Sequence, residues 1–453
     1  MTGICRCVNC ITPPHMLRKL LESADSEIRE SALNTLVSTA RLRGERTVLA
    51  GFAAASRGDG RLTIFDCEQG TVLSAATVAR SEDGLLSKDD SVNRAFDGLG
   101  AARDFFKQVL DRNSIDGRGM RLDGYVHRGV DYNNAFWDGR QMVFGDGDER
   151  LFTDFTKSVD IIAHELTHGI IDFTAGLEYH NQSGALSESI SDVFGSLVKQ
   201  WSLKQTAADA DWLIGAEVFT PGVGPDALRS LKAPGHAYDS PIFGEDPQPD
   251  HMSKFVDLPD TDDSDNGGVH INSGIPNKAF YLTAMGIGGF AWEAPGRIWY
   301  EALKASTANT QFQEFADTTY EKAGDLYGTN SLEQQAVLTA WREVGIRISG
   351  VLAGRATRRR GVPVADREVD SVATLSLAEM DDEAGKIEVK LRLAPNKASS
   401  GGEPAHLKFT AQIRNPLSVF LIAHFGLCVG LTETLSAQVK TLIKDVGASK
   451  GKR

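Results

Sequence analysis

One short stretch constrains the fold and the chemistry of this chain more than any other. Residues 160–172 read DIIAHELTHGIID and contain the pattern HELTH at residues 164–168. Residues four apart lie on the same face of an α-helix, so the side chains of His164 and His168 can reach one metal ion. Glu165 then stands beside the first ligand, where a general base toward a metal-bound water is needed. Apolar residues flank the motif, which predicts a largely buried helix.

The motif alone leaves two interpretations open, because a buried helix can also carry two histidines that are satisfied by local partners. A catalytic zinc ion takes three protein ligands and keeps one position for water. The leading candidate for the third ligand is Glu188, on the next predicted helix. Asp192 lies one turn beyond it and is suited to hold the N–H of His164. Asp172 follows His168 by one turn and can either hold that imidazole or cap the helix.

Length and composition indicate a soluble protein of several domains. The 453 residues exceed one ordinary core, and 41% of them are hydrophobic and 24% charged. The net charge of -13 argues against nucleic acid or an anionic membrane as a main partner, since both attract basic surfaces. No stretch reaches the roughly 18–20 apolar residues that span a bilayer, so we expect no membrane span. We expect the protein to act as a monomer.

The N-terminal region, residues 1–57, is predicted to form a separate helical unit. It lacks the apolar core of a secretory signal peptide, so we expect synthesis in the cytoplasm, with export by a non-classical route left open. A Pro-Pro pair precedes one apolar helical stripe, a second helix is predicted at 25–42, and the small-residue stretch 49–60 is a predicted linker. The unit is either a docked helical hairpin or a removable pro-segment.

Three of the five cysteines, Cys5, Cys7 and Cys10, cluster near the N-terminus. They can bind a metal, send a thiolate to the catalytic zinc, or remain reduced thiols. An odd and unevenly placed set of cysteines argues against a disulfide framework.

The remaining chain divides into three predicted domains, which make the fold class α+β. Residues 58–180 form a β-rich lobe that ends in the motif helix, and residues 181–347 form a helical lobe. Residues 348–453 form an extension whose function the sequence does not predict. The β-rich lobe is expected to contain strands at 61–79 (with 71–73 as one of them), 120–130 and 141–144, and a helix at 93–111.

The extension is predicted to contain a β-hairpin followed by a helix. Residues 386–393 and 407–413 alternate apolar and polar side chains, and the connection between them is rich in Ser and Gly. The helix is expected near 432–444.

The segment AHELTHGIIDFTAGLEYHNQSGALSESISDVFGSL resembles the active-site segment of thermolysin-like zinc metalloendopeptidases. Two further stretches are similar to that family and occur in its order, YNNAFWDGRQMVFGDG at 132–147 and DNGGVHINSGIPNK at 265–278. The N-terminal CITPPHMLRKL resembles the short precursor segment of the protealysin-like subgroup. The resemblance implies a two-lobed fold, one catalytic zinc ion, and cleavage of internal peptide bonds before a hydrophobic residue. It also implies an inhibitory pro-segment that is removed by self-cleavage. Cleavage just before Leu49 or Phe52 would place a hydrophobic residue after the scissile bond.

The resemblance assigns two groups of residues, one to the reaction and one to the peptide substrate. To the reaction it assigns the zinc ligands His164, His168 and Glu188, the general base Glu165, the oxyanion donors His270 and Tyr179, and Asp265, which orients His270. To the substrate it assigns Asn134 and Arg229, which hold its backbone, Ala135 and Trp137 on an edge strand, and Phe152, Phe155, Ile161 and Leu228, which line a hydrophobic pocket.

The chain departs from the family at a paired calcium site. Asp160 is retained there, but Lys199 and Ala216 stand where thermolysin has acidic ligands. A lysine repels a divalent cation, so we expect this calcium site to be absent or crippled. Two rival functions stay open: another zinc hydrolase, such as an aminopeptidase, and a catalytically silent binding or inhibitory protein.

Overall fold

The computed structural model describes residues 9–49, 60–349, 371–381, 386–395 and 406–412. The chain divides into two compact units, residues 1–358 and 359–453. The first unit contains all the predicted site residues.

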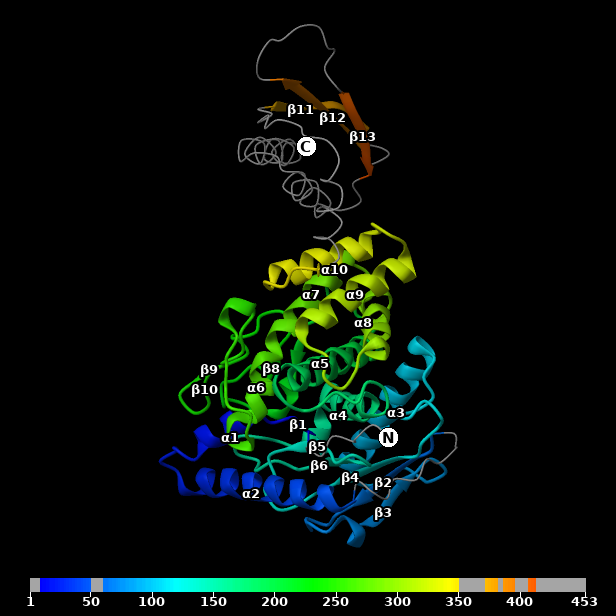
Figure 1. Ribbon diagram of the computed structural model, residues 1–453. Coiled ribbons are helices and arrows are strands. Elements are labelled where there is room, and N and C mark those ends of the chain that lie inside the picture. The colour runs from blue at the N-terminus through cyan, green and yellow to red at the C-terminus, as the bar shows by residue number, and fades with distance from the viewer. Residues whose placement is uncertain (1–8, 50–59, 350–370, 382–385, 396–405, 413–453) are drawn as a thin grey trace, which may run out of the picture. The chain divides into compact units, whose positions relative to one another are not determined.

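The N-terminal segment consists of a short strand, β1 (Asn9–Cys10), and two helices, α1 (Pro14–Leu20) and α2 (Ser26–Leu49) (Figure 1). Pro13 and Pro14 lie at the N-cap and first turn of α1, where a missing N–H costs no helical hydrogen bond. The second helix is longer than the predicted 25–42. Most of the predicted linker, residues 50–59, lies outside the described residues.

A six-stranded sheet forms the first lobe, with the order β1-β5-β6-β4-β2-β3. Its other strands are β2 (Leu62–Asp66), β3 (Thr77–Ser81), β4 (Leu122–Val126), β5 (Ala135–Trp137) and β6 (Met142–Phe144). β4 pairs in parallel with β2 on one side and with β6 on the other. The remaining strand pairs are antiparallel. The helix α3 (Asp90–Leu110) packs on the sheet and begins where the Asp89 side chain accepts hydrogen bonds from two backbone N–H groups.

The predicted strand at 71–73 is wrong. That segment enters a short 3₁₀ turn at Leu73–Ala75, and the strand follows at β3. Val72 and Val78 are exposed, so the apolar residues here do not mark a strand packed in the core. Tertiary context, rather than local propensity, sets the position of β3.

Two long helices form the centre of the first unit, α4 (Val159–Asp172) and α5 (Asn181–Leu203). Every residue of α4 from Asp160 to Ile171 is buried, as the flanking apolar residues predicted. The two helices pack closely at Gly195, where a Cβ atom would lie 2.6 Å from the carbonyl oxygen of Asp160. A side chain at this position would therefore push the two helices apart.

The second lobe consists mainly of helices, most of them packed on α5, and Figure 1 shows them in green and yellow. They are α6 (Asp265–Asn272), α7 (Gly274–Ile287), α8 (Ala294–Ala305), α9 (Phe312–Tyr327) and α10 (Leu332–Glu343). Two small antiparallel ribbons precede them, β7 (Leu213–Ile214) with β8 (Arg229–Ser230), and β9 (Asp239–Ser240) with β10 (Gly244–Glu245).

In the described part of the second unit, three strands form an antiparallel sheet: β11 (Ser371–Asp381), β12 (Lys386–Pro395) and β13 (His406–Gln412), paired in that order. The predicted hairpin corresponds to β12 and β13, whereas β11 was not predicted. The helix expected near 432–444 lies outside the described residues.

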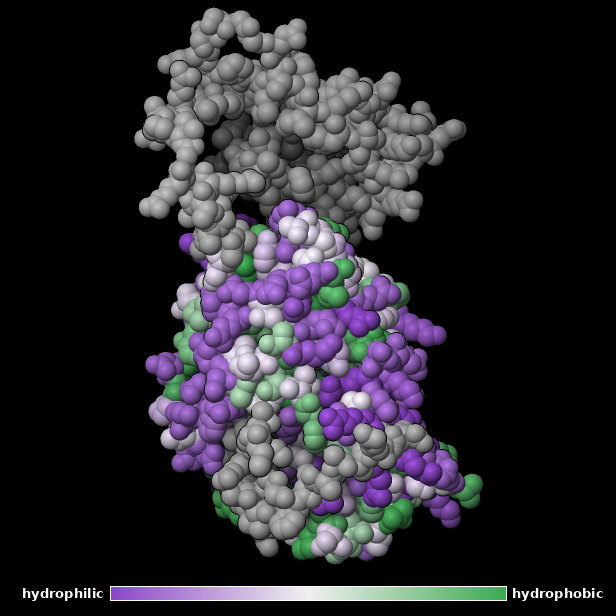
Figure 2. All heavy atoms as spheres, turned by 45° about the vertical axis from the view of Figure 1, so that its right-hand side comes forward, coloured by the Kyte–Doolittle hydropathy of each residue, from purple (hydrophilic) through white to green (hydrophobic). Residues whose placement is uncertain are grey.

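Within the described part of the chain, no helix is both long and apolar enough to cross a membrane. On the face shown in Figure 2, hydrophilic residues predominate, and apolar residues are scattered rather than gathered in one broad patch.

Candidate active site

The helices α4 and α5 bring the three predicted zinc ligands together. The Nε2 atoms of His164 and His168 lie 2.9 Å apart, and Glu188 oxygens lie 3.6 and 3.3 Å from them. All three side chains are fully buried, and among the described residues they form the one group of at least three His, Cys, Asp or Glu residues arranged to hold a metal ion. Glu188 Oε2 has no hydrogen-bond partner in the described structure. Two imidazoles and an unsatisfied carboxylate oxygen fit a zinc ion.

Asp192, which was predicted to hold the N–H of His164, lies beside that residue. Its Oδ1 lies 2.9 Å from His164 Nδ1, and the Arg229 guanidinium donates two hydrogen bonds of 2.8 Å to its two oxygens. Asn277 donates a further hydrogen bond of 2.9 Å. Burial alone would raise the pKa of Asp192, but Arg229 and His164 lower it to about 2. The ionised carboxylate favours a proton on His164 Nδ1 and leaves Nε2 for the metal.

The partner of His168 is not the residue that the sequence suggested. Ser191 Oγ lies 3.1 Å and Ser187 Oγ 3.3 Å from His168 Nδ1. Asp172 instead accepts a hydrogen bond of 2.8 Å from the indole N–H of Trp137. It therefore ties the motif helix to the edge strand β5.

The predicted oxyanion donors lie beside the same cluster. The Tyr179 hydroxyl donates to Glu188 Oε1 and lies 3.3 Å from His270 Nε2. Asp265 accepts from His270 Nδ1 at 2.6 Å and from the His270 backbone N–H at 2.9 Å. Burial would lower the pKa of His270, but Asp265 and Glu188 raise it to about 9, so both ring nitrogens carry protons at neutral pH.

A strained turn aims His270 at the site. Residues 265–268 all have φ between +49° and +83°, the left-handed region. Such conformations are costly for residues with side chains and persist where the surrounding structure holds them. The two glycines of this turn adopt these conformations without steric cost, whereas Asp265 and Asn266 adopt them at a cost.

Glu165 is fully buried, and neither of its carboxylate oxygens has a hydrogen-bond partner in the described structure. Burial and the nearby Glu188 raise the pKa of Glu165 well above its usual range. A carboxyl group with a raised pKa is suited to take a proton and return it.

The predicted substrate-binding residues contact the N-terminal segment of the same chain. β1 pairs with β5 in antiparallel fashion, and the Ile11 N–H donates to the carbonyl of Ala135 at 3.1 Å. Asn134 accepts from the Thr12 N–H at 2.9 Å, and Arg229 donates to the Ile11 carbonyl at 2.9 Å. The edge strand and both predicted backbone-binding side chains are thus hydrogen-bonded to the N-terminal segment.

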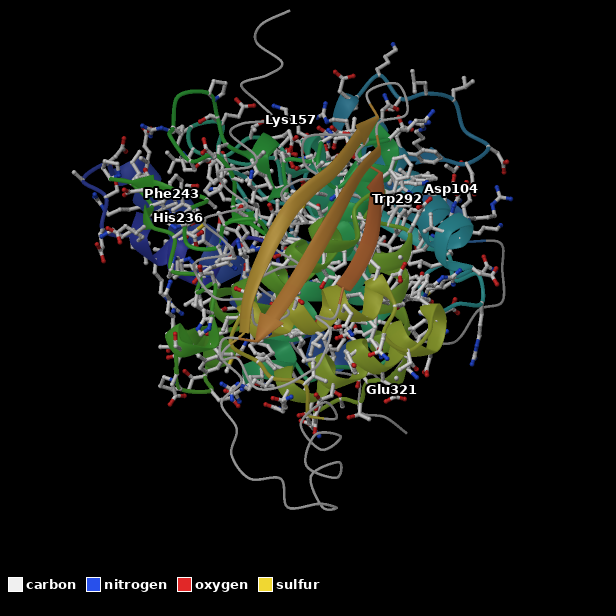
Figure 3. All side chains as sticks on the ribbon, turned by 90° about the horizontal axis from the view of Figure 1, so that it is seen from above. Asp104, Lys157, His236, Phe243, Trp292 and Glu321 are labelled. Atoms are coloured by element: carbon white, nitrogen blue, oxygen red, sulfur yellow. The ribbon has the colours of Figure 1, made fainter. Side chains whose placement is uncertain are left out.

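The four predicted pocket residues are all buried, and the structure brings them together in two pairs. The side chains of Ile161 and Leu228 both border Gly215, and the rings of Phe152 and Phe155 stack with centroids 5.9 Å apart. Two aromatic residues that the sequence did not suggest, Phe219 and Phe243, lie 5.2 and 5.6 Å from the Phe152 ring. Figure 3 shows Phe243 and His236 on the same side of the molecule as the blue helices α1 and α2.

Lys199 occupies the surroundings of Asp160. Its ammonium lies 3.2 Å from Asp160, 3.0 Å from Asp211 and 3.6 Å from Glu217. A fixed positive charge thus lies among the carboxylates that would otherwise attract a divalent cation, and the loss of the calcium site stays a prediction.

Of the three N-terminal cysteines, the structure describes Cys10 alone. Cys5 and Cys7 lie outside the described residues, and Cys10 is buried in a small apolar group with Tyr132, Phe136 and Val143.

Comparison with known proteins shows which family the chain resembles. Residues 53–172 match "Thermolysin metallopeptidase, catalytic domain", and residues 175–346 match "Thermolysin metallopeptidase, alpha-helical domain". The chain belongs to the thermolysin family. It is therefore a zinc metallopeptidase with the two-lobed fold of that family.

Individual relatives of this thermolysin-family chain share most of its first unit. It is 44% identical over 341 residues to an extracellular metalloprotease of Pectobacterium carotovorum subsp. carotovorum, covering 75% of this chain and 96% of the relative. It is 42% identical over 346 residues to protease PrtS of Photorhabdus sp. (strain Az29), covering 75% and 92%. The solved precursor of protealysin, from Serratia proteamaculans, matches with a TM-score of 0.67 and 45% identity, covering 75% and 99%. This likeness places the chain in the protealysin-like subgroup.

Proposed function

We propose that this protein is an endopeptidase precursor that cleaves internal peptide bonds before hydrophobic residues. The observation that carries the proposal is the buried cluster His164, His168 and Glu188, with an unpartnered carboxylate at Glu165 and proton donors at His270 and Tyr179. When bound, a zinc ion would be held by the first three residues and would activate water and polarise the substrate carbonyl.

The chain's own residues would transfer the proton, stabilise the oxyanion and hold the substrate. Glu165 takes a proton from the attacking water and passes it to the departing amine. The N–H of His270 and the hydroxyl of Tyr179 stabilise the negative charge that develops on the carbonyl oxygen, and removing one such donor typically costs about 100-fold in rate. Asn134 and Arg229 hold the substrate backbone, and the pocket formed by Phe152, Phe155, Ile161 and Leu228 receives the residue after the scissile bond.

The N-terminal segment is proposed to inhibit the enzyme until it is removed. Its backbone occupies the edge strand, Asn134 and Arg229, so a substrate cannot bind there at the same time. Removal by self-cleavage in the linker is part of the proposal. Leu49 is the last residue of α2, so a bond before it becomes accessible only if that helix frays, whereas Phe52 lies outside the described residues. The likeness to an extracellular metalloprotease supports action outside the cell.

A peptide blocked at both ends tests the proposal. We expect internal cleavage, loss of activity on chelation and recovery with zinc. An aminopeptidase would leave such a peptide intact, and so would a catalytically silent protein.

Glu165→Gln provides a second test, because it removes the base and keeps the shape of the side chain. Zinc content should stay at that of the unaltered protein, whereas kcat should fall by about 100-fold or more. Undiminished turnover in this variant would contradict the assigned role of Glu165.

A further inference from the structure

The N-terminal segment does more than cover the groove, because it lies there as one more strand of the sheet. Cys10 pairs with Phe136 and Asn9 with Trp137 in the antiparallel register. The Ile11 N–H continues this pattern by donating to the carbonyl of Ala135. Adding a strand to a free sheet edge is a general way for a groove to hold an extended peptide, with backbone hydrogen bonds fixing the register.

The side-chain contacts identify one peptide bond within this strand. The Cys10 carbonyl oxygen accepts a hydrogen bond of 2.7 Å from His270 Nε2, and the Tyr179 hydroxyl lies 3.3 Å from that nitrogen. These are the two groups proposed to stabilise the developing oxyanion. The carbonyl carbon of Cys10 therefore lies where the reacting carbon of a substrate would lie.

The contacts on the other side of this bond are those proposed for the leaving group. Arg229 donates to the Ile11 carbonyl at 2.9 Å, and Asn134 accepts from the Thr12 N–H at 2.9 Å. The Ile11 side chain is fully buried in the apolar core of this unit. The amide between Cys10 and Ile11 thus has an oxyanion donor on its acyl side and the backbone-binding groups on its amine side.

The part of the segment after Ile11 is anchored independently of this bond. Met16, Leu17 and Leu20 of α1 are buried in the core. On α2, Thr35 Oγ1 accepts from the Asn133 N–H at 3.1 Å, and Asp25, just before α2, forms an ion pair of 2.6 Å with Arg150. Breaking the amide after Cys10 would leave these contacts in place.

We infer that the Cys10–Ile11 peptide bond is a site of self-hydrolysis within the docked precursor, distinct from cleavage in the linker. This inference rests on the proposed function. The water oxygen bonds to the Cys10 carbonyl carbon, the C–N bond to Ile11 breaks, and Glu165 transfers the water's proton to the leaving nitrogen. The products are a fragment ending in a Cys10 carboxylate and a pro-segment that begins at Ile11 and stays docked.

Cleavage inside one molecule has a kinetic signature. The reacting groups are held together by the fold, so the rate constant does not depend on protein concentration. Cleavage of one molecule by another slows in proportion to dilution.

The test uses the full chain purified without zinc, and adding zinc starts the reaction. Intact mass spectrometry follows it at protein concentrations spanning about 100-fold. We expect residues 1–10 to be released with one concentration-independent rate constant, and not to be released from Glu165→Gln. Release that slows with dilution would overturn the inference.

Two substitutions at the bond test the register. Ile11→Leu keeps an apolar side chain and should keep cleavage after residue 10, whereas Ile11→Asp should reduce it by about 10-fold or more, because burying an unpaired carboxylate is unfavourable. Equal cleavage of both variants would contradict the inference.

A blocked reporter peptide, assayed in the same samples after removal of the pro-segment, separates the two proposals. Reporter hydrolysis with the Cys10–Ile11 bond intact throughout would overturn this inference alone. Absence of both reactions would overturn the proposed function and the inference with it.

Discussion

At the scale of single residues, Asp192 links the metal cluster to the substrate groove. One of its oxygens faces His164, and both accept hydrogen bonds from Arg229, whose third contact is the Ile11 carbonyl. All three side chains are buried, so their charges are weakly screened. Asp192 would therefore orient both His164, a proposed metal ligand, and Arg229, which is proposed to hold the peptide.

This link predicts that Asp192→Asn weakens zinc binding. The amide keeps the size of the side chain but loses the charge that favours a proton on His164 Nδ1, and such partners typically contribute about 10–100-fold to metal affinity. Competition with a chelator would measure the loss. Asp172→Asn is the matched control, because Asp172 contacts Trp137 rather than a ligand. Equal zinc affinity in the two variants would contradict the role of Asp192.

Helical spacing was enough to predict part of this site. His164, His168, Glu188 and Asp192 lie on helices, where the period of the helix fixes which side chains share a face. The partner of His168 was not predictable in the same way, because the one-turn spacing pointed to Asp172, which contacts Trp137 instead. The structure gives that role to Ser191 and Ser187, and no periodicity indicated them.

At the scale of elements, α1 brings a titratable group into the covered groove. His15 Nε2 lies 2.9 Å from the Tyr238 hydroxyl, and His15 Nδ1 has no hydrogen-bond partner in the described structure. Burial lowers the pKa of His15 to about 4; Asp265 opposes the shift, and His270, Arg229 and Arg18 add to it. The docked segment therefore holds His15 neutral.

This burial predicts that the pro-segment docks less firmly in acid. An undocked histidine has a pKa of about 6.5, so docking is fully stable above that pH and weakens as the pH falls toward 4. The population of the undocked form should rise by up to about two orders of magnitude over this range. Hydrogen exchange of α1 in the Glu165→Gln precursor, corrected for intrinsic rates, measures it.

His15→Leu supplies the control for this pH dependence. It cannot be protonated, so its α1 should stay protected over the same pH range. Identical pH profiles for the two precursors would show that another group controls docking.

A second element-level feature is the lysine that joins the start of α4 to α5. Lys199 contacts Asp160, Asp211 and Glu217, so the structure contains its own cation here. We predict that calcium leaves the melting temperature unchanged. Lys199→Met should lower the stability by about 3 kcal/mol, because it leaves the buried Asp160 without its ion-pair partner.

Calorimetry with and without calcium checks both statements about Lys199. Added calcium should restore part of the stability of Lys199→Met, since three carboxylates then face one another without a cation. A calcium-dependent melting temperature in the unaltered protein would contradict the predicted loss of the site.

Sequence periodicity predicts the regular elements but not the contacts made by irregular segments. The buried amphipathic helix α3 was predicted within a few residues, because one of its faces packs on the core. The aromatic residues Phe219 and Phe243 were missed, because they lie in irregular segments without a period and meet Phe152 only through the tertiary fold.

At the scale of the whole molecule, the catalytic parts and the extension are separate compact units. Residues 1–358 contain the sheet, the helices around α5 and every proposed site residue. The order of lobes was predictable from the change of β to helical patterns and from the family resemblance. The strand β11 was not predicted, and its pairing with β12 shifts register between Leu377 and Glu379, which interrupts the period of two.

This division predicts that the extension is dispensable for peptide hydrolysis. Once the pro-segment is removed, a chain that ends at residue 358 should match the full-length protein in kcat/KM for a blocked peptide and in the melting temperature of its first unit, because the core and the groove are complete without residues 359–453. Activity that appears only after the deletion would instead assign the extension an inhibitory role. A lower melting temperature would show that it stabilises the catalytic unit.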